Sequence, residues 1–452
     1  MNAAANKHSN KATADAWPSE SSRGWPVLRL RFCATVNPSR SELNGLPEDT
    51  EVSFVPMESV CEYGGLRLDQ TKPLADVSTG YTYFRDGDVV VAKITPCFEN
   101  GKGSIAQGLT SSVGFGTTEL HVLRPSPRLD PAFLFYLTIS HPFRSIGAAH
   151  MYGAGGQKRV PDDFVRDFRH PIPPPDEQRA IAAFLDRETA RIDALIEKKR
   201  RQIELLHEKR AALISHAVTK GLDPNAPMKD SGLDWLGSIP SHWMIRRFRF
   251  DLTSIEQGWS PQCDNSLAEL HEWGVLKVGC VNGTEFDESE HKRLPDELEP
   301  RTAYEIKPGD ILMSRANTTE LLGSAVLVRK VRPRLLLCDK LYRMRVDPRL
   351  LDSEFVVYAF GSHATRYQFE RDATGASASM KNIGQDTIKA LLMPRPPVDE
   401  QRDIVQVLSA QCERVHQVVV MVSTSIDRLR EYRTALISAA VTGKLDVRQE
   451  VA

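Results

Sequence analysis

The sequence has few cysteines, no long apolar run and almost no net charge. Its seven cysteines are scattered and form no Cys-x-x-Cys pair. This argues against a disulfide framework or a cysteine-rich zinc site and fits a reducing cytosol. No stretch of about 18 consecutive apolar residues occurs, so a membrane span is not expected. Lys and Arg total 58 and Asp and Glu total 59, which excludes a general polyanion binder but not a local basic face. We therefore expect a cytoplasmic protein.

Sequence motifs of the common catalytic sites are also missing. There is no Gly-x-x-x-x-Gly-Lys-Ser/Thr loop for ATP, no Gly-x-Gly-x-x-Gly loop for a dinucleotide, and no His-Glu-x-x-His zinc motif. The Asn/Asp-Pro-Pro-Tyr/Phe tetrapeptide of adenine methyltransferases is absent as well. Glu290-x-Lys292 is half of a metal-nuclease pattern without its Pro-Asp partner, and we interpret it as a surface charge cluster. His141 and His363 recur at matching positions, which indicates a shared folding role. The sequence predicts a binding protein that holds no metal or cofactor.

The most informative feature of the 452 residues is an internal repeat. The segment that begins at Pro171 matches the segment that begins at Pro394 without a gap, at an offset of 223 residues (401 − 178, from Gln401 and Gln178). Both copies carry a Pro-Pro-x-Asp-Glu-Gln-Arg sequence and, farther on, Ala-Leu-Ile-Ser-x-Ala-Val-Thr. Composition alone makes Leu/Glu/Lys-rich helices resemble one another, but it does not produce a gapless match that includes these two motifs.

The duplication extends weakly upstream of each match. Trp25 and Trp243 each open a half, followed by Arg-Leu-Arg-Phe and Arg-Arg-Phe-Arg-Phe. Each half is therefore predicted to be one variable domain followed by one long helix. The expected division is a disordered N-terminal extension (1–23), a first variable domain (24–170), a central long helix (171–223), a linker (224–243), a second variable domain (244–393) and a C-terminal long helix (394–447).

The repeated segment is predicted to form a coiled coil. The first copy has about 40 residues without an internal Gly or Pro, which gives a helix of roughly 60 Å. Apolar residues recur at intervals of seven in both copies, as in a coiled-coil seam. This seam comprises Leu185, Ile192, Leu206, Leu213, Leu408, Val415, Val422, Leu429 and Leu436. Because each helix leaves one apolar stripe uncovered, we expect the two to pack antiparallel. The basic run Lys198–Arg201 is interpreted as a solvated helix face, with DNA backbone contact as the alternative.

The two variable domains contain short strand-like runs separated by Gly, Pro, Asn and Asp, with brief helical patterns near 131–140 and 353–369. The pattern predicts an α+β fold with a mixed or antiparallel sheet. Their loops carry Arg, Lys, Asn, Gln and hydroxyl side chains of the kind that bond base edges or phosphates. The candidates are Lys93, Thr95, Gln157, Lys158, Arg159, Ser260, Gln262, Arg315, Asn317, Thr318, Lys381 and Asn382. Any one of them could equally well serve as a structural turn or cap.

Over nearly its whole length, the chain resembles the specificity (S) subunits of type I restriction–modification systems. The resemblance is carried by Pro-x-Pro-Pro-x-x-Glu-Gln at Pro171–Gln178 and Pro394–Gln401, by the Ala-Leu-Ile-Ser-x-Ala-Val-Thr ends, and by the segment Met228–Trp243. Shorter matches are Val52–Met57, Gly258–Cys263 and Trp273–Gly279. The combination is specific, whereas no single tetrapeptide is.

The resemblance implies that two target-recognition domains are separated by an antiparallel two-helix spacer. Each domain would read one half of an asymmetric, bipartite site in double-stranded DNA. The helices would dock two modification subunits, which bind S-adenosylmethionine and methylate adenine, and restriction subunits would add ATP- and Mg-dependent translocation and cleavage. None of this chemistry would reside in this chain. The alternative is an architectural coiled-coil protein whose end domains bind other proteins.

Overall fold

The computed structural model describes residues 23–153, 156–377 and 380–449, so that the predicted N-terminal extension lies almost wholly outside the described residues. The chain divides into two units, and each unit holds one half of both long helices. Unit 1 comprises residues 1–199 and 423–452, and unit 2 comprises residues 200–422. The long helices are α5 (Pro175–Lys220) and α9 (Val398–Val441), with 46 and 44 residues. The prediction of two long helices is confirmed.

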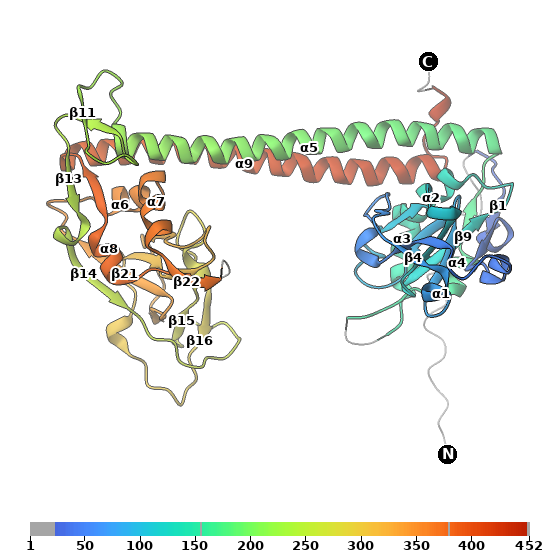
Figure 1. Ribbon diagram of the computed structural model, residues 1–452, viewed down its shortest axis with the longest axis horizontal. Helices are drawn as coiled ribbons and strands as arrows, with labels where there is room; N and C mark the ends of the chain where they lie inside the picture. Colours follow the sequence, from blue (N-terminus) through green and yellow to red (C-terminus); the bar gives the residue numbers. More distant parts are fainter. Residues whose placement is uncertain (1–22, 154–155, 378–379, 450–452) are drawn as a thin grey trace. The chain divides into compact units, whose positions relative to one another are not determined.

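The recognition domain of unit 1 is an α+β fold built on two four-stranded sheets (Figure 1). One has the strand order β2-β9-β6-β7, and the other, β4-β3-β8-β5, is mixed because β3 pairs parallel with β8. Its elements are β1 (Val27–Arg29), η2 (Leu30–Phe32), β2 (Ala34–Val36), η3 (Arg40–Leu43), β3 (Glu51–Val55), η4 (Met57–Ser59), β4 (Thr71–Pro73), α1 (Leu74–Val77), β5 (Thr82–Arg85), β6 (Val89–Ala92), β7 (Gly103–Ile105), η5 (Thr110–Ser112), β8 (Val113–Gly116), β9 (Leu120–Pro125), α2 (Pro131–Ile139), α3 (His141–Ala149), α4 (Asp162–Asp167) and β10 (Arg169–Pro171).

The recognition domain of unit 2 repeats this plan with different residues. Its four-stranded sheet, β14-β21-β17-β19, corresponds strand for strand to β2-β9-β6-β7, and β15 pairs parallel with β20. Its elements are β11 (Met228–Asp230), β12 (Ser238–Pro240), β13 (Met244–Arg247), η6 (Phe248–Phe250), β14 (Leu252–Gln257), β15 (Gly274–Leu276), η7 (Val278–Val281), β16 (His291–Arg293), η8 (Thr302–Tyr304), β17 (Ile311–Ser314), β18 (Ala316–Asn317), β19 (Ala325–Leu327), β20 (Leu335–Leu336), β21 (Leu341–Val346), α6 (Ser353–Phe360), α7 (His363–Asp372), β22 (Thr374–Ser377), β23 (Met380–Asn382), α8 (Gln385–Ala390) and β24 (Leu392–Arg395), and η9 (Val447–Gln449) closes the described chain in unit 1.

The segment 224–243, predicted as a linker, is part of the folded unit 2. It forms the antiparallel hairpin β11–β12, and Leu236, Ile239 and Trp243 are buried in the core of that unit. Three-residue strands are too short to produce a readable alternation of apolar and polar residues. The periodic pattern of apolar residues is therefore interrupted in this segment, although the hairpin packs into the core of unit 2.

The long helices run antiparallel in each unit. In unit 2, Ile214 and Val218 near the end of α5 share a core with Ile404 and Leu408 near the start of α9. In unit 1, the earlier Asp193 of α5 pairs with the later Arg433 of α9, with 3.2 Å between Oδ2 and Nη2. Residue numbers therefore rise along one helix where they fall along the other.

The nine residues of the predicted seam are all buried or partly buried. Six of them are at most 8% exposed, namely Leu185, Ile192, Leu408, Val415, Val422 and Leu436. The other three, Leu206, Leu213 and Leu429, are half-buried. Of the apolar residues beside the seam on α5, Ile196 is buried but Leu195 is 41% exposed. The apolar stripe is therefore narrow at this point of the helix.

A buried glutamine fixes each recognition domain to the start of its long helix. The Gln178 side chain is fully buried, where its Oε1 accepts from the Asp130 backbone N–H and its Nε2 donates to the carbonyls of Arg128 and Pro173. Gln401 makes the same three bonds in unit 2, to the Asp352 N–H and to the carbonyls of Leu350 and Pro396. Buried polar groups must find partners, and this explains why both copies of the repeat carry glutamine here.

The neighbouring glutamate holds the tryptophan that opens each half. Trp25 Nε1 donates to Glu177 Oε2 over 3.1 Å, and Trp243 Nε1 donates to Glu400 over the same distance. The buried indoles thus satisfy their N–H groups at the helix start. The Glu-Gln motif is therefore a junction. Its glutamine positions the recognition domain, and its glutamate positions the tryptophan of the incoming chain.

The repeated serine of the second motif bonds the other half of the chain. In unit 1 the His141 backbone N–H donates to Ser438 Oγ (3.1 Å), and in unit 2 the His363 N–H donates to Ser215 Oγ (2.9 Å). Each domain is thus fastened to the start of one long helix and to the end of the other. The matching histidines contribute their backbone to the fold, in line with the folding role predicted for them.

Candidate nucleic-acid interface

In unit 1 the fold brings together the two groups of loop residues that the sequence singled out. Lys93 and Thr95 follow β6, and Gln157 to Arg159 lie about sixty residues later. The Val160 N–H donates to the Lys93 carbonyl and the Thr95 N–H donates to the Lys158 carbonyl, each over 2.9 Å. These five candidates therefore share one short stretch of paired backbone.

Their side chains are not equally available to a ligand. Arg159 makes a two-pronged ion pair with Glu119, with both N–O distances at 2.8 Å. This hydrogen bonding lowers the pKa of the Glu119 carboxyl, so the pair stays charged near neutral pH. The Thr95 hydroxyl donates to Glu99 Oε1 over 3.0 Å. Gln157 and Lys158 are exposed, which leaves them as the most accessible of the five candidates.

In unit 2 the same backbone arrangement holds different side chains. The Ile383 N–H donates to the Arg315 carbonyl over 2.9 Å, as Val160 does to Lys93. Asn317 lies opposite Lys381, and Ala316 opposite Asn382, in the antiparallel pair β18–β23. The candidates Arg315, Asn317, Thr318, Lys381 and Asn382 are thus brought together from two segments.

The remaining pair of candidates, Ser260 and Gln262, joins this face through Asp339. The Ser260 hydroxyl donates to the Asp339 carboxylate, and Arg315 Nη1 donates to the Asp339 carbonyl over 3.1 Å. Gln262 lines an adjoining pocket of about 300 Å³ together with Ser260, Lys277 and Lys292. Three stretches that are far apart in sequence therefore meet on one surface of unit 2.

Sequence reasoning missed the acidic and amide partners of these residues. Glu119 holds Arg159, Asp339 holds Ser260 and Arg315, and Asn282 Oδ1 accepts from Asn317 Nδ2 over 3.0 Å. None of the three stands in a motif or in the gapless repeat. They are identified as partners only in the folded structure, where strands that are distant in sequence pair.

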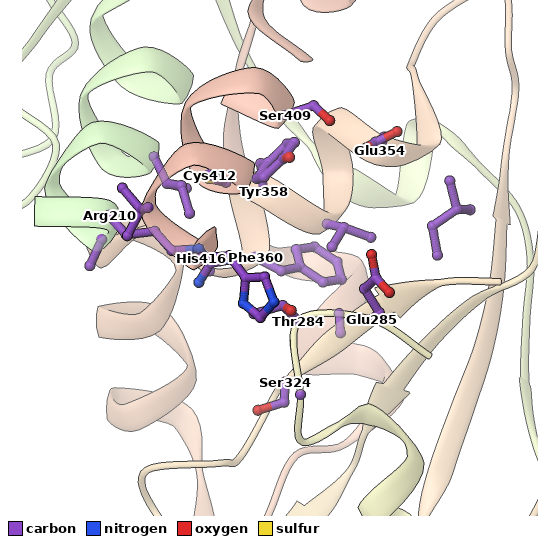
Figure 2. A pocket seen from close by; sticks show the side chains of 18 of the residues that line it. Arg210, Thr284, Glu285, Ser324, Glu354, Tyr358, Phe360, Ser409, Cys412 and His416 are labelled. Carbon is purple, nitrogen blue, oxygen red and sulfur yellow. The ribbon is translucent and has the colours of Figure 1, made fainter. Parts of the chain in front are cut away.

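Unit 2 also contains a groove of about 920 Å³ between its two helix segments and its recognition domain (Figure 2). Arg210, Cys412 and His416 line it from the helices, and Tyr358 lines it from α6. Burial raises the pKa of the Cys412 thiol and raises the pKa of Tyr358 to about 12. Both groups therefore stay protonated and weakly nucleophilic at neutral pH.

Two classes of site are not found in the part of the chain that the structure describes. No group of three or more His, Cys, Asp or Glu side chains within residues 23–153, 156–377 and 380–449 is placed to hold a metal ion. In the same ranges, no helix is both long enough and apolar enough to cross a membrane. Glu290 of the nuclease-like pattern pairs with Lys277, with 3.5 Å between carboxylate and ammonium, on the surface of unit 2.

Known proteins share this sequence pattern. A family model described as the type I restriction modification DNA specificity domain matches residues 60–205. The specificity subunit of the type I restriction enzyme EcoEI from Escherichia coli is 28% identical over an alignment 475 positions long, which covers 88% of this chain and 79% of that protein. The EcoAI specificity subunit from Escherichia coli is 40% identical over a shorter stretch, 36% of this chain and 28% of that protein.

The chain is thus similar to type I restriction–modification specificity subunits over most of its length. Solved structures of such proteins share its fold. The HsdS subunit from Thermoanaerobacter tengcongensis matches 96% of this chain and 100% of its own at 18% identity, with a TM-score of 0.53. A chain from a study of complex assembly and conformational transition of the type I R-M system matches 95% of this chain and 100% of its own at 18% identity, with a TM-score of 0.71.

Proposed function

We propose that this chain recognises a bipartite, asymmetric site in double-stranded DNA, with each recognition domain reading one half. The observation that carries the proposal is that one backbone arrangement presents two different side-chain sets. Lys93, Gln157 and Lys158 stand on it in unit 1, and Arg315, Asn317 and Lys381 stand on it in unit 2. Different donors and acceptors select different bases in the major groove, so the two half-sites should be unlike.

The long helices would set the unspecified gap between the half-sites and, with the domain flanks, dock two modification subunits. A rise of about 1.5 Å per residue makes the 46-residue α5 roughly 69 Å long. Half-sites one helical turn of DNA apart lie about 34–36 Å from centre to centre. A helix of this length can hold two recognition domains at that separation.

The chemistry would reside on the partners. S-adenosylmethionine would bind to the modification subunits, which methylate adenine, and ATP and Mg to the restriction subunits. Its near-zero net charge implies that the partners provide much of the phosphate clamp, since phosphate contacts dominate DNA affinity.

The experiment is a methylome. The chain is expressed with its modification subunit in a host free of adenine methylation, and the genomic DNA is sequenced with detection of modified bases. We expect N6-methyladenine in one split, asymmetric motif that is absent when this chain is omitted. A soluble complex that leaves no mark, or a mark that does not depend on this chain, would contradict the proposal.

An insertion into one long helix tests the spacer. Four added residues lengthen the helix by about one turn, or ~6 Å. We expect the gap in the methylated motif to change while both half-site sequences stay the same. A changed half-site with an unchanged gap would show that the helices do not set the spacing.

A further inference from the structure

An exposed phenylalanine occurs at the same place in both units. Phe32 ends the short 3-10 helix η2, and Phe250 ends its counterpart η6. The side chains are 66% and 52% exposed. A single exposed aromatic residue is unremarkable on a protein surface. The repetition of one in two domains that otherwise differ strongly requires a physical reason.

The local backbone shows that the two positions are equivalent. The Leu30 N–H donates to the Phe168 carbonyl, and the Phe248 N–H donates to the Leu391 carbonyl, over 3.0 and 2.8 Å. The side chains of Leu30 and Phe248 are fully buried. The inner residue of each short helix therefore packs in the core, while the outer phenylalanine remains outside it.

Arginines lie over the exposed ring of unit 2 and close in sequence to that of unit 1. In unit 2 the guanidinium groups of Arg246 and Arg249 lie 5.1 and 4.8 Å from the Phe250 ring centre. In unit 1, Arg29 and Arg31 precede Phe32 in sequence, and both bond to Asp167. Each unit thus presents an exposed aromatic ring with arginines near it in the chain, and in unit 2 two of them lie over the ring. Exposed aromatic residues together with arginine are typical of interface hot spots.

Neither packing nor base reading explains this repetition. The rings are too exposed to contribute to the cores, and a residue shared by both units cannot distinguish two unlike half-sites. A feature kept in both units serves a task that both units perform. In the proposed function the two units share two tasks, contact with the DNA backbone and binding of one copy each of the same partner. Phosphate and sugar are contacted mainly through charged and polar groups, whereas an exposed apolar ring suits a protein partner.

We propose that Phe32 and Phe250 are twin anchor residues, each of which docks one of the two modification subunits. The matching surface on that subunit would be an apolar pocket rimmed by carboxylates, complementary to the ring and the arginines. This inference rests on the proposed function, because it requires a partner that binds in two copies.

The test measures stoichiometry. Full-length Phe32→Ser, Phe250→Ser and the double variant are each co-expressed with the modification subunit, and the complexes are analysed by native mass spectrometry across a dilution series. We expect each single variant to bind one of its two modification subunits about 30-fold more weakly, as expected for a hot spot. The double variant should lose both. Leu270→Ser is the matched control, since Leu270 is 71% exposed in unit 2 and should leave two subunits bound.

Two further measurements separate a loss of docking from a loss of folding. Thermal unfolding of each variant should match the parent chain, because the rings are exposed. Arg249→Glu keeps both rings and should weaken one copy about tenfold by reversing a rim charge.

The outcomes distinguish the two proposals. A wild-type complex that methylates a split motif, together with a double variant that retains both subunits, overturns the anchor role and leaves the proposed function standing. A wild-type chain that binds no modification subunit overturns both. A double variant that keeps its subunits but loses DNA binding assigns the rings to DNA, and one that loses self-association assigns them to a second copy of this chain. Either of the last two results overturns the inference.

Discussion

The junctions at the starts of the two long helices are nearly identical, whereas the two faces proposed to read DNA are not. Gln178 and Gln401 make the same three hydrogen bonds, each to one N–H and two carbonyls. On the reading faces, the carbonyl of Lys93 in unit 1 and that of Arg315 in unit 2 accept equivalent bonds, but the side chains differ. The framework is repeated because both halves need it. On the proposed function, the side chains of the two faces differ because each face would contact its own half-site.

Loss of a junction glutamine should have the largest effect on stability. Gln178→Leu or Gln401→Leu leaves one backbone N–H and two carbonyls without their side-chain partner. At each junction one of these bonds is buried and two are partly buried. A buried group without a partner costs about 1–3 kcal/mol, so we expect each variant to lose about 2 kcal/mol or more of its unfolding free energy. Chemical denaturation measures this.

The control for that comparison is Gln417→Leu, an exposed position on α9, which should change stability by less than about 0.5 kcal/mol. Similar losses at positions 178 and 401 would support equivalent junctions. A large loss at one and none at the other would show that the two halves are fastened differently.

Changes on the reading faces should be smaller and confined to one half-site. Gln157→Ala should relax selection at a position of the first half-site, and Asn382→Ala at a position of the second. A base contact is worth about 1–3 kcal/mol of discrimination. Methylation of a panel of single-base variants of the motif measures the effect. If either variant altered both half-sites, the division of labour between the units would be wrong.

The two units should also respond differently to acid. In unit 1, His170 is fully buried and its Nε2–H donates to the Val441 carbonyl, and burial lowers the imidazole pKa from 6.5 to about 4. Below pH 6.5 the unfolded chain takes up a proton that the folded chain does not. The contribution of neutral His170 to the free energy of unfolding should therefore be fully present above pH 6.5. It should fall by about 1.4 kcal/mol per pH unit between pH 6.5 and 4.

Unit 2 provides the control for this prediction. At the position equivalent to His170 it has Met393, which is also buried. His170→Met should flatten the dependence of the unfolding free energy on pH in this range. An unchanged slope would mean that other groups cause the acid sensitivity.

The smallest effect is expected on the exposed face of α5. Lys198 lies in the basic run and is exposed. If this run is a solvated face, Lys198→Glu should change stability by less than about 0.5 kcal/mol and leave the methylated motif and its salt dependence unchanged. A reduced salt slope of DNA binding would instead indicate a phosphate contact.

Sequence reasoning recovered the features that repeat or have a long period. The two long helices follow from seven-residue spacing and from a gapless duplication, and buried strands such as β6 and β17 follow from apolar runs between turn residues. The hairpin in residues 224–243 was missed because its strands have three residues each.

The contacts of the candidate residues could not be predicted from the sequence, for a physical reason. Loop composition identified Arg159 and Arg315 as side chains able to bind DNA. It could not show that Glu119 engages the first or that the Asp339 carbonyl engages the second. Those contacts join residues 40 and 24 positions apart, and they arise from strand pairing that no local pattern encodes.

The central claim is that one repeated framework holds two recognition domains that read different half-sites. Its most direct test is a chain in which both recognition domains are the same. Residues 243–393 are replaced by residues 25–170, so that Trp25 takes the place of Trp243 beside Glu400, and the methylome is determined with the modification subunit. We predict a palindromic split motif composed of two copies of the first half-site. An unchanged asymmetric motif, or a motif unrelated to the first half-site, would contradict the account.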